Sequence, residues 1–400
     1  MAEAVIVATA RTPIGRAGKG SLVEARPDDM SAFIIDDVLG KVPALPRDQV
    51  EDVIWGTGQP GGEQGYNVAR VAALLAGLDA PGVTVNRYCS SSLQTIRMAA
   101  HAIRAGEGDV FMAGGVECVS RYQYGAADNG PHNAEFADAE ARTAGRSGEG
   151  SDGWTAPEGF PDIYMAMGQT AENVAQHMGV SRQAQDEWGV RSQNRAEAAR
   201  DRGFFEREIS PYTLPDGTVV SLDDGIRAGT TYEKVSQLNP VFRPDGTVTA
   251  GNACPLNDGA AAVVVMSDTR AAELGITPLA RIVSSGVSSL NPEIMGLGPI
   301  GAINQALGRA GMTADDIDLF EINEAFAAQV LPSADAVGID HDKLNVNGGA
   351  IALGHPFGMT GARIMTTLLN ALEDGDAEFG VESMCVGGGQ GMAMVVPRLN

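Results

Sequence analysis

Long hydrophobic runs and an excess of positive charge are both missing from this sequence of 400 residues. No uninterrupted apolar stretch approaches the roughly 20 residues that a membrane-spanning helix needs, so we expect no insertion into a membrane. The formal net charge is -23, which disfavours nucleic acids and anionic membrane surfaces as partners because their phosphates would be repelled. The first residues lack a basic region followed by a hydrophobic core, and we therefore expect a cytoplasmic protein without a secretory signal.

Cysteine and histidine are also scarce. The four cysteines lie far apart without any CxxC pair, at positions 89, 118, 254 and 385. This spacing predicts neither a metal site nor a disulfide framework. Glycine, in contrast, is abundant at 51 residues while hydrophobic residues make up 44%. Such a composition indicates tight turns and close backbone approaches in a globular chain of two or three structural units.

Two halves of the chain repeat the same order of patterns. In the first half, the strand-like VTVNRYC precedes a helical segment and the strand-like GDVFMAGGVE; in the second, LNVNGGAIALGH precedes the helical GARIMTTLLNAL and the strand-like VESMCVGGGQG. Strands that alternate with helices predict an α/β fold with largely parallel sheets. We expect a first half over residues 1–120, rejoined by about 250–272, and a second half over 273–400.

The intervening residues, 121–249, read as an insertion. Their first third is rich in Gly, Ala, Asp and Pro and predicts a long loop. A helical segment follows from Ala171, and the run TLPDGTVVSLD predicts a hairpin around Asp216 and Gly217. The stretch AGNACPLNDGAAAVVVMSD, from Ala250, predicts a buried strand that returns to the first half.

Cys89 is predicted at a turn from a buried strand that ends at Val85 to a helix. The free N–H groups and the dipole of a helix start stabilise a thiolate, which would make Cys89 a nucleophile. A small apolar residue that fills a gap in the core is an equally good interpretation of the turn alone.

Glycine-rich turns flank two further candidates. His355 lies in NGGAIALGHPFGMTGAR, where an imidazole could act as a general base. Cys385 runs into three consecutive glycines whose N–H groups could bind an oxyanion, although a tight hairpin would explain them too. Together these features favour a nucleophilic Cys/His site. Asn323, in EINEAFAAQV, is better explained from the residues alone as a helix N-cap.

These motifs resemble the thiolase family along essentially the whole chain: NRYCSSSLQ around Cys89, NEAF from Asn323, NVNGGAIALGHPFGMTGAR around His355 and CVGGGQG from Cys385. The resemblance implies the five-layered αβαβα thiolase fold with an inserted loop domain that covers the coenzyme A site. It also implies a homodimer or homotetramer, no permanently bound cofactor or metal, and acyl-CoA and coenzyme A as substrates and products.

The resemblance further implies a role for each site residue. Cys89 would carry the acyl group as a thioester, and His355 would activate Cys89 or the thiol of coenzyme A. Cys385 would be the second acid/base. Asn323 would hold a water that forms one oxyanion hole with His355, while the N–H groups of Cys89 and Gly387 would form the other.

Substrate contacts are implied at Arg227, near the nucleotide, at Met295 and Phe326, along the channel, and at Cys254, where many acetoacetyl-CoA thiolases have serine. Ala166 likewise replaces a histidine of that subgroup. These departures favour a degradative 3-ketoacyl-CoA thiolase that works by a ping-pong mechanism. The alternatives are an acetoacetyl-CoA thiolase that condenses two acetyl groups and, in another class, a non-catalytic thiolase-like acyl or lipid carrier. Acyl chain length cannot be read from the sequence.

Overall fold

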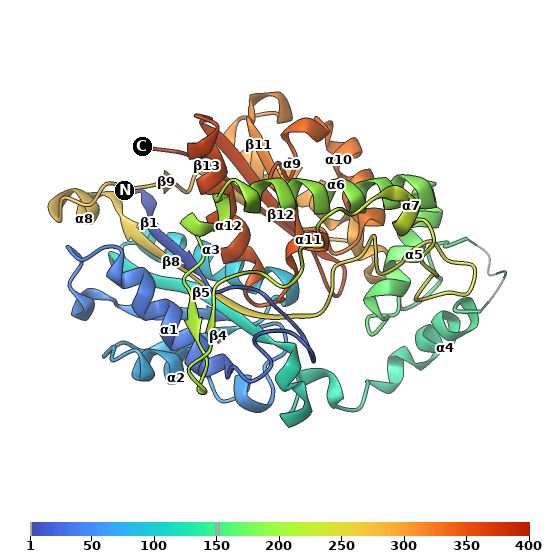
Figure 1. Cartoon of the computed structure of the whole chain (residues 1–400), viewed down its shortest axis with the longest axis horizontal. Coiled ribbons are helices and arrows are strands. Elements are labelled where there is room, and N and C mark those ends of the chain that lie inside the picture. The colour runs from blue at the N-terminus through green and yellow to red at the C-terminus, as the bar shows by residue number, and fades with distance from the viewer. Residues whose placement is uncertain (1, 149, 151–152) are drawn as a thin grey trace.

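The computed structural model describes residues 2–148, 150 and 153–400. Two sheets enclose a central layer of helices, and further helices cover the outer face of each sheet (Figure 1). The first half, in blue and cyan, forms one side of the molecule, the second half, in orange and red, forms the other, and the green inserted helices lie at one end. This arrangement confirms the predicted α/β thiolase fold. Within the described residues, no helix has the length and apolar composition needed to cross a membrane.

The first sheet has the strand order β4-β3-β5-β8-β1-β9, with β2 paired to β8. Its strands are β1 (Ala4–Arg11), β2 (Gly15–Arg16), β3 (Asp52–Gly56), β4 (Gly82–Val85), β5 (Val110–Cys118), β8 (Asn257–Ser267) and β9 (Ala280–Arg281). The second sheet has the order β10-β13-β12-β11. Its strands are β10 (Ser284–Ser289), β11 (Leu319–Ile322), β12 (Phe379–Val386) and β13 (Gln390–Pro397).

Both sheets are mixed, so the prediction of largely parallel sheets is wrong. Only the pairs β3–β4, β3–β5 and β11–β12 are parallel among the named strands. Strand β13 follows β12 through a three-residue turn and must therefore run antiparallel to it. Strand β8 likewise enters antiparallel between β5 and β1.

The internal repeat is real and includes β8. The order β3-β5-β8-β1 in the first sheet matches β11-β12-β13-β10 in the second, with the same parallel and antiparallel senses. The strand predicted after Ala250 therefore does rejoin the first half. One detail of the prediction fails, because β4 is an edge strand whose Val83 is 38% exposed and not a buried strand.

Helices α3 (Ser91–Ala105) and α12 (Thr360–Asp374) form the central layer and pack on each other. A Cβ atom at Gly361 would collide with the backbone of Leu93, so glycine permits this close approach. Helices α1 (Pro27–Gly40) and α2 (Val68–Leu75) cover the first sheet, and α9 (Gly298–Ala310) and α10 (Ala327–Val337) cover the second. The short helices α8 (Asp268–Glu273) and α11 (Ala350–Leu353) precede β9 and the His355 turn.

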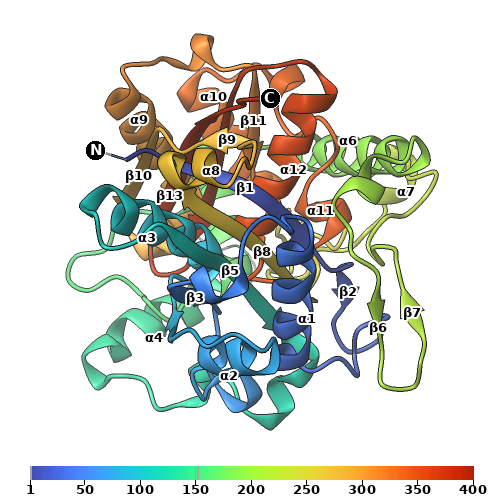
Figure 2. The same cartoon turned by 90° about the vertical axis from the view of Figure 1, so that its left-hand side faces the viewer.

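The inserted segment is more helical than its composition predicts. It contains α4 (Ala137–Arg146), α5 (Met167–Met178), α6 (Arg182–Asp201) and α7 (Tyr232–Val235), so the expectation of one long loop before residue 163 is only partly right. The helical segment predicted from Ala171 is split at Gly179, which has a φ of 66°. The predicted hairpin forms as β6 (Tyr212–Thr213) and β7 (Val219–Val220), which pack beside α1 (Figure 2).

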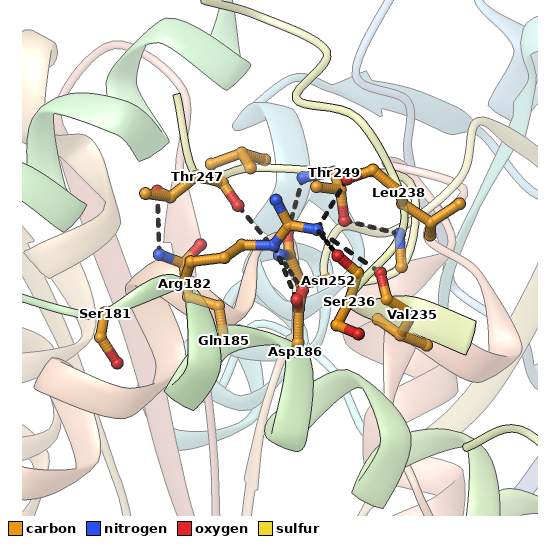
Figure 3. A network of polar contacts seen from close by, with 12 residues as sticks. Ser181, Arg182, Gln185, Asp186, Val235, Ser236, Leu238, Thr247, Thr249 and Asn252 are labelled. Atoms are coloured by element: carbon orange, nitrogen blue, oxygen red, sulfur yellow. Dashed lines mark hydrogen bonds and ion pairs between the residues drawn. The ribbon is translucent and has the colours of Figure 1, made fainter. Parts of the chain in front are cut away.

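Polar contacts fasten the end of this segment to α6 (Figure 3). Arg182 donates to Asp186 Oδ2 over 2.7 Å and to the carbonyl of Leu238 over 2.7 Å. Asp186 Oδ1 in turn accepts from the side chain of Asn252 over 2.8 Å. Asn252 lies two residues before Cys254. The network therefore positions the backbone that places Cys254 near Cys89 and Cys385.

Candidate active site

Cys89 lies in a short 3-10 turn, Tyr88–Ser90, between β4 and α3. This location confirms the predicted strand-to-helix turn. The hydrogen bonds that hold the turn include those from Tyr88 N–H to Asn86 Oδ1 over 2.8 Å and from Arg87 N–H to Ser91 Oγ over 2.9 Å. Tyr88 has a φ of 42°, an uncommon conformation for a bulky residue that the surrounding contacts must maintain.

The thiol of Cys89 is 8% exposed and lines a pocket of about 330 Å3. Burial raises its pKa to about 11, and the N–H groups of Gly387 and of Cys89 itself donate toward the sulfur and oppose this rise. The backbone N–H groups thus favour the thiolate, as expected for this turn, but burial has the larger effect. Desolvation outweighs the backbone donors, and the thiol is neutral before substrate binds.

The three glycines after β12 confirm the hairpin interpretation offered by the sequence. They form a tight hairpin in which Gly388 and Gly389 each have a φ of 78°. The same hairpin places the Gly387 N–H beside the sulfur of Cys89. Two N–H groups thus converge on the position where negative charge would develop on a group attached there.

Cys385 is fully buried near the end of β12. The 3-10 turn of Cys89 packs against this strand. Burial raises the pKa of the Cys385 thiol, and the proximity of Cys89 and Cys254 raises it further. The thiols of Cys89, Cys254 and Cys385 therefore lie close together. The sequence motifs had predicted this for Cys89 and Cys385.

His355 lies on the turn that precedes α12 and is 1% exposed. Its backbone N–H donates to Asn257 Oδ1 over 2.9 Å. Its Nδ1 lies 2.6 Å from Thr360 Oγ1, whose hydroxyl proton goes to the carbonyl of Pro356. Thr360 must then accept from Nδ1–H, which leaves Nε2 as the basic nitrogen.

Nothing in the described residues hydrogen-bonds to that Nε2 atom. Burial lowers the pKa of His355 to about 3, and the positive charge of Arg363 lowers it further. The imidazole is therefore neutral near pH 7, and its Nε2 carries no proton. The same turn supplies Phe357 to the wall of the Cys89 pocket.

Asn323 is not a helix cap, so the interpretation favoured from the residues alone is wrong. Helix α10 starts at Ala327, with Phe326 as its N-cap. The amide of Asn323 is 1% exposed, and neither its Nδ2 nor its Oδ1 has a partner among the described residues. A buried amide of this kind requires a water or a ligand to complete its hydrogen bonds.

The predicted substrate residues divide into two groups. Met295 and Phe326 pack in one buried cluster with Cys385, and the Cys254 N–H donates to the Ala325 carbonyl over 3.0 Å. Arg227 does not join them. Its side chain is exposed on the loop before α7, and its backbone N–H donates to Gln193 Oε1 over 2.8 Å.

Several residues of the pocket wall were missed from the sequence. They come from three separate segments: Gly58 and Gln59; Asp128 and His132; and Ile163, Tyr164, Met165 and Met167. Cys89 and Gly387, which line the same pocket, had been predicted as site residues, and Ala166 had been noted as a departure from related sequences. Among the described residues, no group of three or more His, Cys, Asp or Glu side chains is arranged to hold a metal ion.

Comparison with known proteins identifies the family. The family models "Thiolase, N-terminal domain" and "Thiolase, C-terminal domain" match residues 4–269 and 276–398. A 3-ketoacyl-CoA thiolase of Aeromonas hydrophila is 44% identical over 409 residues, and an acetyl-CoA acetyltransferase of Cupriavidus necator is 44% identical over 407; both alignments cover 100% of each chain.

A crystal structure of the Bacillus anthracis acetyl-CoA acetyltransferase superposes with a TM-score of 0.87 at 37% identity, covering 100% of this chain and 99% of that one. These similarities extend over the full length and agree with the repeated halves and the motifs described above. The chain therefore belongs to the thiolase family of acyltransferases.

Proposed function

We propose that this chain cleaves 3-ketoacyl-CoA thioesters reversibly into acetyl-CoA and a shortened acyl-CoA, with the acyl group carried on Cys89. One observation carries the proposal: the Cys89 sulfur lies at a pocket, beside the N–H of Gly387 and in the neighbourhood of Cys385. A nucleophile, a donor for an oxyanion and a second thiol acid/base are the groups that this reaction needs.

In the first half-reaction, the Cys89 thiol gives its proton to His355 Nε2 while the sulfur attacks the keto carbon. The carbon–carbon bond then breaks and leaves the acyl thioester on Cys89. Cys385 protonates the departing enolate to give acetyl-CoA and recovers a proton from His355. The coupling of proton transfer to attack follows from the raised pKa of the Cys89 thiol, which disfavours a free thiolate.

In the second half-reaction, coenzyme A gives its thiol proton to His355 and attacks the thioester. Cys89 leaves as a thiolate and takes up the proton that His355 received from coenzyme A. One oxyanion is stabilised by the N–H groups of Cys89 and Gly387, and the other by His355 with a water held by Asn323. The buried and unpaired amide of Asn323 supports this assignment.

Coenzyme A would enter beneath the inserted segment, which we propose as the loop domain over residues 121–249. Most arginines of α6 and the following turn are already engaged by acidic groups or carbonyls, including Arg182, Arg191, Arg195, Arg200, Arg202 and Arg207. Arg227 has no such partner among the described residues and lies near Arg16, whose charge contributes to lowering its pKa. This pair is our candidate for the nucleotide phosphates.

A homodimer or homotetramer remains our proposal for the assembly. Within the described residues, no strand pairs with the outer side of the edge strand β4. Exposed apolar side chains lie on β4 (Val83), on neighbouring α2 (Leu74 and Leu75) and in the turn before α2 (Tyr66). An unpaired edge beside exposed apolar groups is suited to pairing with a second copy.

The competing function is condensation of two acetyl groups by an acetoacetyl-CoA thiolase, and two compared proteins carry the name acetyl-CoA acetyltransferase. The pocket favours longer acyl groups, since Ala166 with Ile163 and Met165 provides a largely apolar wall. Initial rates with 3-ketoacyl-CoA substrates of 4 to about 12 carbons distinguish the two. We expect kcat/KM to rise beyond four carbons, whereas strict restriction to acetoacetyl-CoA would favour the alternative.

A further inference from the structure

A buried carboxylate that the steps above do not use lies in the 3-10 turn Pro292–Leu297, two residues before Met295. This turn belongs to the second half and packs on α5, α10 and β12. Glu293 is 1% exposed. Its Oε2 accepts from the indole N–H of Trp154 over 2.8 Å, and its Oε1 accepts from the backbone N–H of Asp162 over 3.0 Å. One side chain of the second half thus binds two places in the inserted segment.

Two arginines of α4 supply the opposite charge. Arg142 Nη2 lies 3.7 Å from Glu293 Oε1, and Arg146 Nη1 lies 3.8 Å from Glu293 Oε2. Arg142 also donates to the carbonyl of Phe160 over 2.6 Å. A buried carboxylate is destabilising unless it is paired and hydrogen-bonded. The pairing therefore keeps α4 and the chain around residues 160–162 against the turn that carries Glu293.

The residues that follow, 163–167, all line the pocket of Cys89, and we call them the wall segment. Asp162, which binds Glu293 through its N–H, also accepts from the N–H of Tyr164 over 3.0 Å. Asn173 Nδ2 donates to the carbonyl of Glu293 over 2.9 Å and lies 3.4 Å from the sulfur of Met165. The wall segment is thus joined to Glu293 twice, once through the carboxylate and once through the backbone.

The wall segment also reaches the glycine hairpin after β12. A Cβ atom at Gly388 would lie 3.3 Å from Ile163 Cδ1, so the wall segment lies beside the hairpin that carries Gly387. Cys89, Gly387 and the wall segment line the same pocket. Neither Cys89 nor Gly387 hydrogen-bonds to Glu293 among the described residues, so a displaced wall segment would change the space for an acyl chain and leave the sulfur chemistry in place.

We propose that Glu293 is a positioning residue that holds the wall segment in place and thereby sets which acyl chains can occupy the pocket. The inference rests on the proposed use of this pocket for the acyl group of the substrate. Glu293 acts only through the residues that it binds. A long apolar chain depends on close packing along its length, which requires a wall of fixed shape, whereas an acetyl group on Cys89 needs little of it.

Initial rates of Glu293→Gln with acetoacetyl-CoA and with 3-ketodecanoyl-CoA test the inference. Gln keeps the size of the side chain, but it removes the charge and turns an NH2 group toward one of the two N–H donors. We expect the ratio of kcat/KM, ten carbons over four, to fall at least about tenfold, mainly through a higher KM for the longer substrate. A ratio that is unchanged or higher in the folded variant would overturn the inference.

Glu208→Gln is the matched control. Glu208 is also a fully buried carboxylate of the inserted segment, but it binds Arg11 of β1 over 2.7 Å and is not part of the pocket lining. Its replacement removes the same charge and should lower the melting temperature without changing the ratio. An equal fall of the ratio in Glu208→Gln would assign the effect to general destabilisation and overturn the inference.

Trp154→Phe keeps the inference testable if Glu293→Gln does not fold. The indole is only half-buried, and the change removes a single donor to Glu293. We expect the same ratio of kcat/KM to fall about threefold, the equivalent of one hydrogen bond of ordinary strength. An unchanged ratio in this variant would contradict the inference.

Alkylation of Cys89 examines the wall segment without turnover and separates the inference from the proposed function. The probes are iodoacetamide and N-octyl iodoacetamide, with the product located by peptide mass. We expect the rate with the octyl reagent, relative to iodoacetamide, to fall at least about fivefold in Glu293→Gln and to stay constant in Glu208→Gln. If the wild-type enzyme cleaves only acetoacetyl-CoA, the proposed function fails. The fall in relative alkylation would still support the inference, and its absence would overturn it.

Discussion

Glu117 offers the sharpest stability prediction, because one buried carboxyl group joins the pocket loop at Gly58 to the turn that carries His355. Its side chain is fully buried at the end of β5. One oxygen accepts from the backbone N–H groups of Gly58 over 2.7 Å and Gly358 over 2.8 Å. The other accepts from Gln64 Nε2 over 2.7 Å and from the Tyr122 hydroxyl over 2.8 Å. Gly58 lines the pocket, and Gly358 belongs to the turn of His355.

Replacement of Glu117 by Gln keeps the shape and removes the charge. If the new carbonyl oxygen faces the two glycine N–H groups, each bond loses its charge assistance, about 1 kcal/mol apiece. The new NH2 group then faces the NH2 of Gln64, whose own oxygen is already used by the N–H of Cys118. One unpaired buried amide adds about 1–3 kcal/mol, so Glu117→Gln should cost about 3–5 kcal/mol in total.

Urea unfolding followed by tryptophan fluorescence measures this cost from the shift of the transition midpoint. Tyr122→Phe is the matched control, because it keeps the carboxylate and removes one donor, at about 1.5–3 kcal/mol. Folded Glu117→Gln should also lose turnover, since the pocket loop and the His355 turn share this carboxylate. A cost below about 1 kcal/mol, or one no larger than that of Tyr122→Phe, would refute the reasoning.

Three further predictions concern the site. Arg227→Ala should raise the KM for coenzyme A more than it lowers kcat, whereas Arg200→Ala, whose partner Asp201 is on the same helix, should change neither; an unchanged KM in Arg227→Ala would remove it from the site. Ala166→His should fill part of the pocket and lower kcat/KM for long acyl chains at least about tenfold relative to acetoacetyl-CoA; equal losses for all lengths would contradict this. The rate of alkylation of Cys89 by iodoacetamide should rise about tenfold per pH unit from pH 7 to 9, because the pKa of about 11 keeps the reactive thiolate scarce in this range. A rate that is constant near neutral pH would indicate a preformed thiolate and contradict this prediction.

Local patterns predicted the elements around the site well. The turn of Cys89, the central helices and the hairpin after Cys385 follow from features a few residues long: β-branched strand ends, apolar spacing of 3 to 4 residues, and consecutive glycines. The apolar run after Ala250 predicted β8, and the structure confirms that this strand rejoins the first half. Each of these features depends on residues that are close together in the sequence, so the sequence alone is enough to predict it.

Properties that depend on distant packing were not predictable in the same way. Strand β8 runs antiparallel to its neighbours β1 and β5 because of the direction in which the chain returns after the insertion. The position of β4 at the edge of the sheet depends on which strands pair. Asn323 looked like a helix cap because a helical pattern follows it in the sequence. Helix α10 starts only at Ala327, however, with Phe326 as its N-cap. The raised pKa of Cys89 arises from burial, and its pocket is lined by distant residues such as Met165 and Phe357 that no local motif around Cys89 encodes.

The assignment of different roles to the two cysteines is the central claim, and peptide mapping after acylation tests it most directly. Wild-type enzyme mixed with an acyl-CoA and no acceptor should gain one acyl mass per chain, on the peptide that contains Cys89. Cys89→Ala should abolish the adduct. Cys385→Ala should still form it, while thiolysis falls by at least about 10²-fold, the lower range for a lost general acid/base. An acyl group on Cys385 of the wild-type enzyme, with Cys89 unmodified, would contradict the account.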